Sequence, residues 1–84
     1  RIMRIINVLE IINGIPSTIE SFPIHEDQLS EDVTEKAELL FINKINENIS
    51  PEVLSDEDQE IHIEDGFYQN MNGYEVYLSW SNVN

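Results

Sequence analysis

The stretch YEVYLSWS, residues 74–81, decides the fold class. Its large side chains at Tyr74, Val76, Leu78 and Trp80 alternate with residues 75, 77, 79 and 81. An alternation with a period of two is typical of a strand that is buried on one face and exposed on the other. The preceding Asn72-Gly73 pair is a strong signal for a tight turn. The C-terminal segment is therefore predicted to be a β-hairpin.

A two-residue loop at Asn72-Gly73 fixes the register that we expect for this hairpin. The expected pairs are Met71 with Tyr74, Gln69 with Val76 and Phe67 with Leu78. In this register Tyr68 and Asn70 point outward, on the same face as Tyr77 and Glu75.

Two interpretations of residues 56–64 follow from the sequence. If the strand continues backwards with a period of two, Ile61 and Ile63 point inward and His62 points outward. Asp65 would then point inward without a partner, so Asp65-Gly66 is either a bulge or the end of a short helix. Ser55 followed by Asp58 resembles a capping box, which favours a short helical turn over residues 55–60.

The N-terminal segment is predicted to be a second hairpin. Residues 3–12 are rich in Ile and Val, which favour strands, although polar residues at every third position also fit an amphipathic helix. We favour the strand, because Asn13-Gly14 is a hairpin turn signal and residues 18–24 can return beside it. Pro23 cannot donate to a ladder, so this returning strand is expected at a sheet edge.

The middle of the chain is predicted to be an amphipathic helix with Ser30 as its N-cap. Glu31 and Asp32 follow in the first turn, where the helix dipole favours negative charge. A buried stripe recurs every four residues, and Asn48, Ser50 and Pro51 end the helix. Leu39 lies opposite the stripe and is a candidate for contact with a partner. The stripe consists of Val33, Ala37, Phe41, Ile45 and Ile49.

These elements predict a single α+β domain over residues 1–84, with ββαββ order. Four antiparallel strands form one sheet, and one main helix covers one of its faces. The other face is expected to be partly bare. This bare face is expected to carry Tyr68, Tyr77 and His62. Tyr68 and Tyr77, together with Leu39 on the helix, are the residues predicted to contact a second copy or another partner.

The chain is strongly acidic, with 17 Asp and Glu against 4 Lys and Arg and a net charge of −13. Nearly all of the acids lie between Glu20 and Asp65, so we expect them on the outer helix face and on the segment after it. Direct binding to nucleic acid is excluded by the lack of basic residues. The predicted partner is a basic protein surface, and the alternative is a solvated surface with no partner. The predicted binding residues are Glu31, Asp32, Glu35, Glu38, Asp56, Glu57, Asp58 and Glu60.

Other chemistry finds little support in the sequence. There is no Cys, no glycine-rich phosphate loop and no nucleophile with an activating base, so we expect neither an enzyme nor a cofactor. His25 and His62, each beside acids, are the candidates for a metal site, but their spacing matches no known site. No apolar run approaches about 18 residues and no secretory leader is recognisable, so we expect a cytoplasmic protein without a membrane span.

Small size, high negative charge, lack of Cys and many Asn and Ile residues are similar to phage and mobile-element accessory proteins, among them DNA-mimicking inhibitors. This resemblance rests on composition and carries no motif, so it assigns no site residues. It implies a non-catalytic inhibitor that occupies a basic, nucleic-acid-binding surface. The alternatives are a small structural or regulatory homodimer and, third, a small metal-binding protein.

Overall fold

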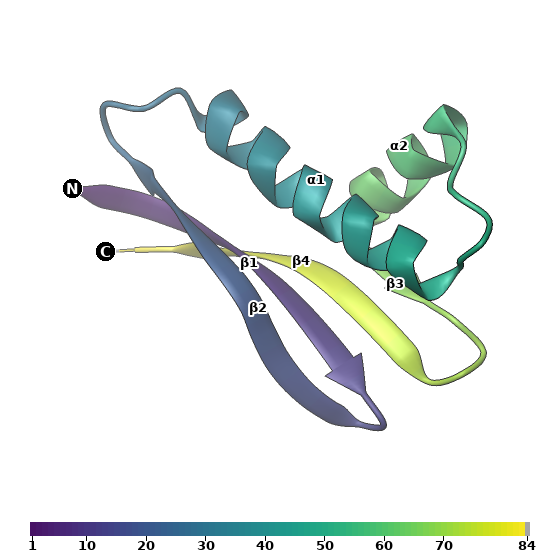
Figure 1. Ribbon diagram of the computed structural model, residues 1–84. Helices are drawn as coiled ribbons and strands as arrows, with labels where there is room; N and C mark the ends of the chain where they lie inside the picture. Colours follow the sequence, from purple (N-terminus) through teal and green to yellow (C-terminus); the bar gives the residue numbers. More distant parts are fainter. Residues whose placement is uncertain (84) are drawn as a thin grey trace.

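A computed structural model describes residues 1–83 and contains one antiparallel sheet with two helices on one face (Figure 1). The predicted α+β class with four antiparallel strands is confirmed. The strand order is β2-β1-β4-β3, so the first and last strands of the chain lie side by side in the centre. The elements are β1 (Ile2–Ile12), β2 (Ile15–His25), α1 (Ser30–Asn48), α2 (Asp56–Asp65), β3 (Phe67–Gln69) and β4 (Tyr74–Asn82).

The N-terminal hairpin forms as predicted, and residues 3–12 are a strand. Ile12 pairs with Ile15, which leaves Asn13 and Gly14 as a two-residue loop. Both loop residues have positive φ, 52° and 79°, as a tight hairpin turn of this kind requires. Pro23 lies in β2, which pairs with β1 alone and is an edge strand, as expected.

Helix α1 packs its predicted stripe against the sheet. Val33, Ala37, Phe41 and Ile45 are all buried, and Ile49 packs against the same core. The predicted N-cap is wrong by one residue. The helix begins at Ser30, its N-cap is Leu29, and no side chain caps it.

Residues 56–65 form helix α2, so the inward-pointing strand with Ile61 and Ile63 is wrong and the helical interpretation is right. The Ser55 hydroxyl accepts a hydrogen bond from the Asp58 N–H at 3.2 Å. At the other end, Gly66 has φ 68° and its N–H donates to the carbonyls of His62 and Ile63. These two caps outweigh the period-two pattern because they satisfy the free backbone groups at both helix ends.

The C-terminal hairpin differs from the predicted register by one residue. Asn70 donates from its backbone N–H to the Tyr74 carbonyl at 2.9 Å, which leaves a three-residue loop, 71–73. The Asn70 side-chain oxygen accepts from the N–H groups of Asn72 and Tyr74 and so stabilises this longer loop. A one-residue slip moves every side chain of a strand to the other face. Tyr68 therefore pairs with Val76 and packs on the core, and its predicted outward position is wrong.

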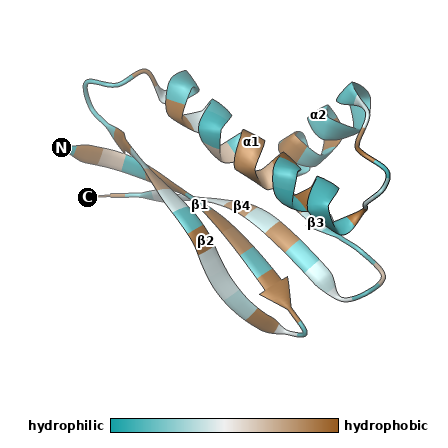
Figure 2. Ribbon diagram, viewed as in Figure 1, coloured by the Kyte–Doolittle hydropathy of each residue, from teal (hydrophilic) through white to brown (hydrophobic). Residues whose placement is uncertain are grey.

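The two faces of the sheet differ in cover. The helices lie against one face (Figure 1), and hydrophobic residues alternate with hydrophilic ones along α1 (Figure 2). The core between them is built from β1, β2, β4 and α1, and the opposite face has no covering element within residues 1–83 (Figure 1). The fully or nearly fully buried side chains are Ile6, Val8, Ile24, Val33, Ala37, Phe41, Ile42, Ile45, Tyr74 and Val76.

Candidate functional site

The candidate site is a groove between the two helices, with an apolar floor and carboxylates at its rim. It is lined by Leu39 and Ile42 from α1 and by Gln59 and Ile63 from α2, with Glu35 and Glu38 beside them. Ile42 is buried, whereas Leu39 is 62% exposed. We call these six residues the α1–α2 groove. Such a groove can take an apolar side chain and, at the same time, basic groups next to it.

Glu38 stands where the negative charge of the groove is most concentrated. Partial burial raises the pKa of Glu38 above its ordinary value, and the nearby charges of Glu60 and Glu35 raise the pKa further. A carboxylate that is crowded by other carboxylates gains the most from an approaching cation. Negative charge is therefore concentrated beside the apolar floor of the groove.

The structure brings together some of the predicted binding residues and separates others. Glu31, Glu35 and Glu38 share one side of α1 and line a shallow hollow there with Ser30 and Thr34. Glu60 acts on Glu38 across the helix pair.

The remaining predicted acids line neither hollow. Asp32 lies outside both, and Asp56, Glu57 and Asp58 form the first turn of α2. Acids in a first turn stabilise the helix itself through its dipole. The structure thus divides the eight predicted acids between helix α1 and helix α2.

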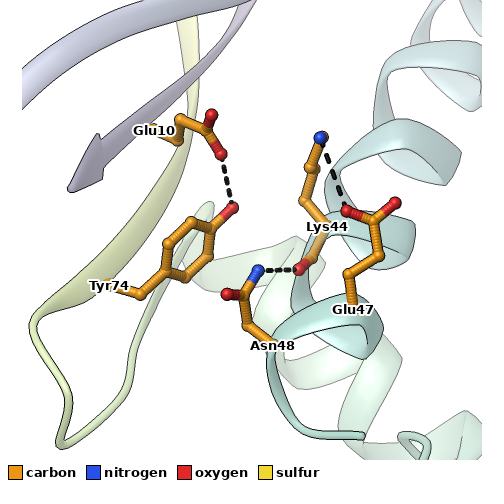
Figure 3. Close-up of polar contacts among 5 residues, drawn as sticks. All are labelled: Glu10, Lys44, Glu47, Asn48 and Tyr74. Carbon is orange, nitrogen blue, oxygen red and sulfur yellow. Dashed lines mark hydrogen bonds and ion pairs between the residues drawn. The ribbon is translucent and has the colours of Figure 1, made fainter.

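The acids of α1 and α2 have few basic partners within the described residues. In the described part of the chain the ion pair is Lys44–Glu47, at 3.4 Å and at the far end of α1 from Glu31 (Figure 3). The Arg4 guanidinium lies over the Trp80 ring, 4.5 Å from its centroid, on the sheet. No Lys or Arg within residues 1–83 therefore pairs with an acid of the α1–α2 groove.

A partly buried polar contact lies outside the groove, at the end of the sheet. The Tyr74 hydroxyl donates to a Glu10 carboxylate oxygen at 2.9 Å (Figure 3). Burial raises the pKa of Tyr74 well above its ordinary value, and the bond to Glu10 and the charges of Glu10 and Glu47 add to this. A shallow asparagine-rich hollow adjoins this contact and went unnoticed in the sequence, lined by Asn13, Asn48, Asn70 and Asn72. The two Asn-Gly pairs are its sequence signal.

Asn48 and Asn70, two of the four asparagines of that hollow, form side-chain hydrogen bonds within the protein itself. Asn48 donates from its side chain to the Lys44 carbonyl at 2.7 Å, and the Asn70 oxygen holds the hairpin loop. They stabilise turns and a helix end rather than presenting a free binding set.

The two histidines lie on different elements. His25 ends β2, and His62 lies in α2 with its ring edge against Tyr68, 5.3 Å between centroids. β2 meets the beginning of α1, whereas α2 follows its end (Figure 1). Among residues 1–83 no three His, Asp or Glu side chains form a group that could hold a metal ion.

The predicted contact residue Tyr77 lies on the face of the sheet that carries no helix. Its ring contacts Phe67 of β3, with centroids 5.0 Å apart, and its hydroxyl donates to Glu75 at 2.6 Å. That hydrogen bond is the main cause that raises the pKa of Tyr77. Phe67 therefore takes the place beside Tyr77 that the sequence assigned to Tyr68.

Comparisons with known proteins give no relative: no family model, no curated protein and no solved structure matches the chain. No helix within residues 1–83 is long and apolar enough to cross a membrane.

Proposed function

We propose that this protein is a non-catalytic binding module. The acids of α1 and α2, which we call the acidic helix layer, engage a basic segment of another protein. The observation that carries the proposal is the α1–α2 groove, in which exposed Leu39 and buried Ile42 are flanked by Glu35 and Glu38. An acidic surface by itself serves solubility equally well. An apolar strip between unpaired carboxylates adds a shape and a chemistry that solubility does not need.

The best fit to this groove is an amphipathic basic helix. Its apolar side chains would cover Leu39, and its Lys or Arg residues would meet Glu31, Glu35 and Glu38 along α1. A cleft shaped for nucleic acid is a second kind of basic surface, and a DNA-mimicking inhibitor would occupy it. Such a cleft offers no partner to Leu39, so the groove favours the amphipathic segment.

The test uses a synthetic amphipathic Leu/Lys helical peptide, with a shuffled peptide of equal composition as its control. Binding is measured by fluorescence anisotropy at about 50 mM and about 500 mM NaCl, which span strong and weak screening. We expect the amphipathic peptide to bind more tightly than the shuffled one, and added salt to weaken but not abolish its binding. Equal affinity for both peptides would show that only bulk charge acts.

Matched variants localise the binding. The triple variant Glu31→Gln, Glu35→Gln, Glu38→Gln should weaken peptide binding by about tenfold or more. The control triple Glu20→Gln, Glu26→Gln, Glu52→Gln removes the same charge from exposed positions outside the groove and should weaken it far less. Leu39→Asn should remove the part of the affinity that remains at high salt. If the two triple variants lose affinity equally, the groove is not the binding site.

Competition with duplex DNA for a natural partner then distinguishes the two kinds of basic surface. Duplex DNA should compete with this protein for a partner that uses a nucleic-acid-binding cleft. It should not compete for one that presents a basic amphipathic segment elsewhere.

A further inference from the structure

The face of the sheet that carries no helix is apolar along its centre. Strand partners share a face, so the register places Ile5, Leu9 and Ile11 of β1 on this side, with Tyr77 of β4 paired to Leu9. Phe67 pairs with Tyr77 and completes the row on β3. Together these five residues, which we call the open face, form a band across the three neighbouring strands β1, β4 and β3.

The open face is also almost free of charge. Of the 17 acids, Glu75 is the one that the strand registers put there, and it accepts a hydrogen bond from Tyr77. The other strand acids, Glu10 and Glu20, lie on the helix side by register, and the rest lie on helices and loops. Nearby polar groups also satisfy one another, since the Ser21 hydroxyl donates to the Asn7 side chain at 2.5 Å.

We propose that the open face binds a second copy of this chain, sheet against sheet, in a two-fold dimer. The distribution of charge over the surface favours a second copy as the partner of this face. Two molecules of net charge −13 repel each other wherever their acidic helix layers meet, and the open face is the surface on which they can approach without that repulsion. A two-fold interface brings the same patch of each copy together, which suits a face on which Glu75 is the one acid and is hydrogen-bonded by Tyr77.

The geometry of packed sheets keeps the acidic layers apart. Two sheets pack about 10 Å apart and each helix layer lies about another 10 Å outside its own sheet, so the two acidic layers are about 30 Å apart. That separation exceeds the Debye length of about 8 Å at physiological salt several-fold. The dimer would thus present two acidic grooves, one on each outer side.

The size of the face sets the expected affinity. The β1–β4 ladder runs from Arg4 to Ile12, about 30 Å of strand, and four strands add a width of about 15 Å. The resulting footprint, on the order of 500 Å², is below the roughly 800 Å² per partner of a typical specific interface. We therefore expect a dimer in the micromolar range. Association through the long β2 edge is opposed by Pro16 and Pro23, which lie in that strand.

Sedimentation equilibrium of the intact chain, from micromolar to hundreds of micromolar, tests the proposal at about 50 mM and about 500 mM NaCl. We expect a monomer–dimer equilibrium that tightens as salt rises, because screening removes the residual repulsion between copies. A chain that stays monomeric at high salt and high concentration overturns the proposal, as does a dimer that weakens with salt.

Matched Lys variants locate the interface. Leu9→Lys puts a charge at the centre of the open face and should raise the dimer dissociation constant by at least about 100-fold. Val53→Lys makes the same change at an exposed loop position outside both the groove and the sheet and should leave it unchanged. Ser79→Lys, at a polar position beside Asn7, keeps the test decisive if Leu9→Lys proves unstable by circular dichroism. If Ser79→Lys dimerises like the unmodified chain, or Val53→Lys does not dimerise, the interface lies elsewhere. Peptide binding by the groove is measured separately, so either proposal can fail without the other.

Discussion

Tyr74 joins the two halves of the chain through one side chain. It begins β4, its ring is buried in the core, and its hydroxyl reaches Glu10 on β1 (Figure 3). The hydrogen bond satisfies the hydroxyl group of the buried Tyr74 ring, and it gives Glu10 a partner on the helix side of the sheet. Burial at this position therefore depends on a charge-assisted contact between residues far apart in the sequence.

Replacing Tyr74 by Phe should lower the free energy of unfolding by about 1–2 kcal/mol, because Glu10 loses its partner in a partly buried place. Urea unfolding at low micromolar concentration measures it. Tyr77→Phe is the matched control, since its hydroxyl also bonds a carboxylate but lies on the open face, and it should change stability far less than Tyr74→Phe. Equal losses in the two variants would contradict a special role for Tyr74.

Glu38 should make stability depend on pH in the direction opposite to a salt-bridged acid. Its pKa in the folded chain is raised, so the folded state holds the proton more tightly than the unfolded state does. Glu38 contributes nothing to the free energy of unfolding below its ordinary pKa, and it becomes destabilising as pH rises through its raised pKa. At pH about 7, Glu38→Gln should therefore increase the free energy of unfolding by about 0.5 kcal/mol.

The gain from Glu38→Gln should shrink as pH falls from about 7, because the unmodified carboxyl takes up its proton at a higher pH in the folded chain than in the unfolded chain. Urea unfolding across this range measures it while staying above the isoelectric point of about 4.1, where solubility is lowest. Glu52→Gln removes the same charge at an exposed loop position and is the matched control. A gain that is constant with pH would mean that charge at Glu38 is not its cause.

Among the elements, those with several agreeing signals were predictable. Helix α1 combines a long apolar stripe with acids in its first turn, and the first hairpin combines Ile-rich strands with Asn13-Gly14. The second hairpin was predicted in kind but not in register, because Asn70 closes a loop one residue longer than Asn72-Gly73 alone implies. That single hydrogen-bonding side chain decides that Phe67, and not Tyr68, shares a face with Tyr77.

Helix α2 shows how caps select an element when periodicity does not. Its apolar residues Ile61 and Ile63 fit a strand equally well, and none of its side chains is fully buried. Ser55 and Gly66 satisfy the backbone groups at its two ends, and the Gly66 carbonyl also accepts a hydrogen bond from Leu78 on β4. The groove depends on this helix, so the groove was beyond reach of the sequence alone.

Gly66→Ala should lower the free energy of unfolding by about 1 kcal/mol, because Ala at φ 68° is strained. Space is not the cause, since an added Cβ would meet Leu78 only at ordinary contact distances. Gly66→Asn is the control and should cost less, because Asn tolerates the left-handed conformation. Thermal and urea unfolding compare the two. If Asn costs as much as Ala, backbone conformation is not what makes Gly66 important.

For the molecule as a whole, the chain order explains why the charge is one-sided. The strands fill the two ends of the sequence and hold Glu10, Glu20 and Glu75, whereas the helices and loops between them hold the other acids. Both helices cross the same face, so the charge gathers on one side of the sheet (Figure 1). The sequence predicted this asymmetry, because it needs only the order of elements. It did not predict which acids meet, because that needs the packing of α2 on α1.

The one-sided charge should also make the folded chain gain stability with salt. Glu31, Glu35 and Glu38 lie one turn apart along one side of α1, and like charges at this spacing repel by about 0.2–0.5 kcal/mol a pair, so screening should recover about 1 kcal/mol in total. Urea unfolding between about 10 mM and about 500 mM NaCl measures the rise at low micromolar concentration, where dimerisation does not contribute. KCl should act like NaCl, because the effect needs no specific ion.

The variant that lacks the charges of Glu31, Glu35 and Glu38 locates this repulsion. At low salt this variant should be more stable than the control that lacks the charges of Glu20, Glu26 and Glu52. It should also gain less stability on adding salt, because the three acids that it lacks face one another along one strip of α1. Equal salt responses in the two variants would place the repulsion in the overall charge and not in the helix layer. Salt then acts in opposite directions on the two proposed surfaces: it stabilises the fold and tightens the open-face dimer, while it weakens a basic segment bound in the groove.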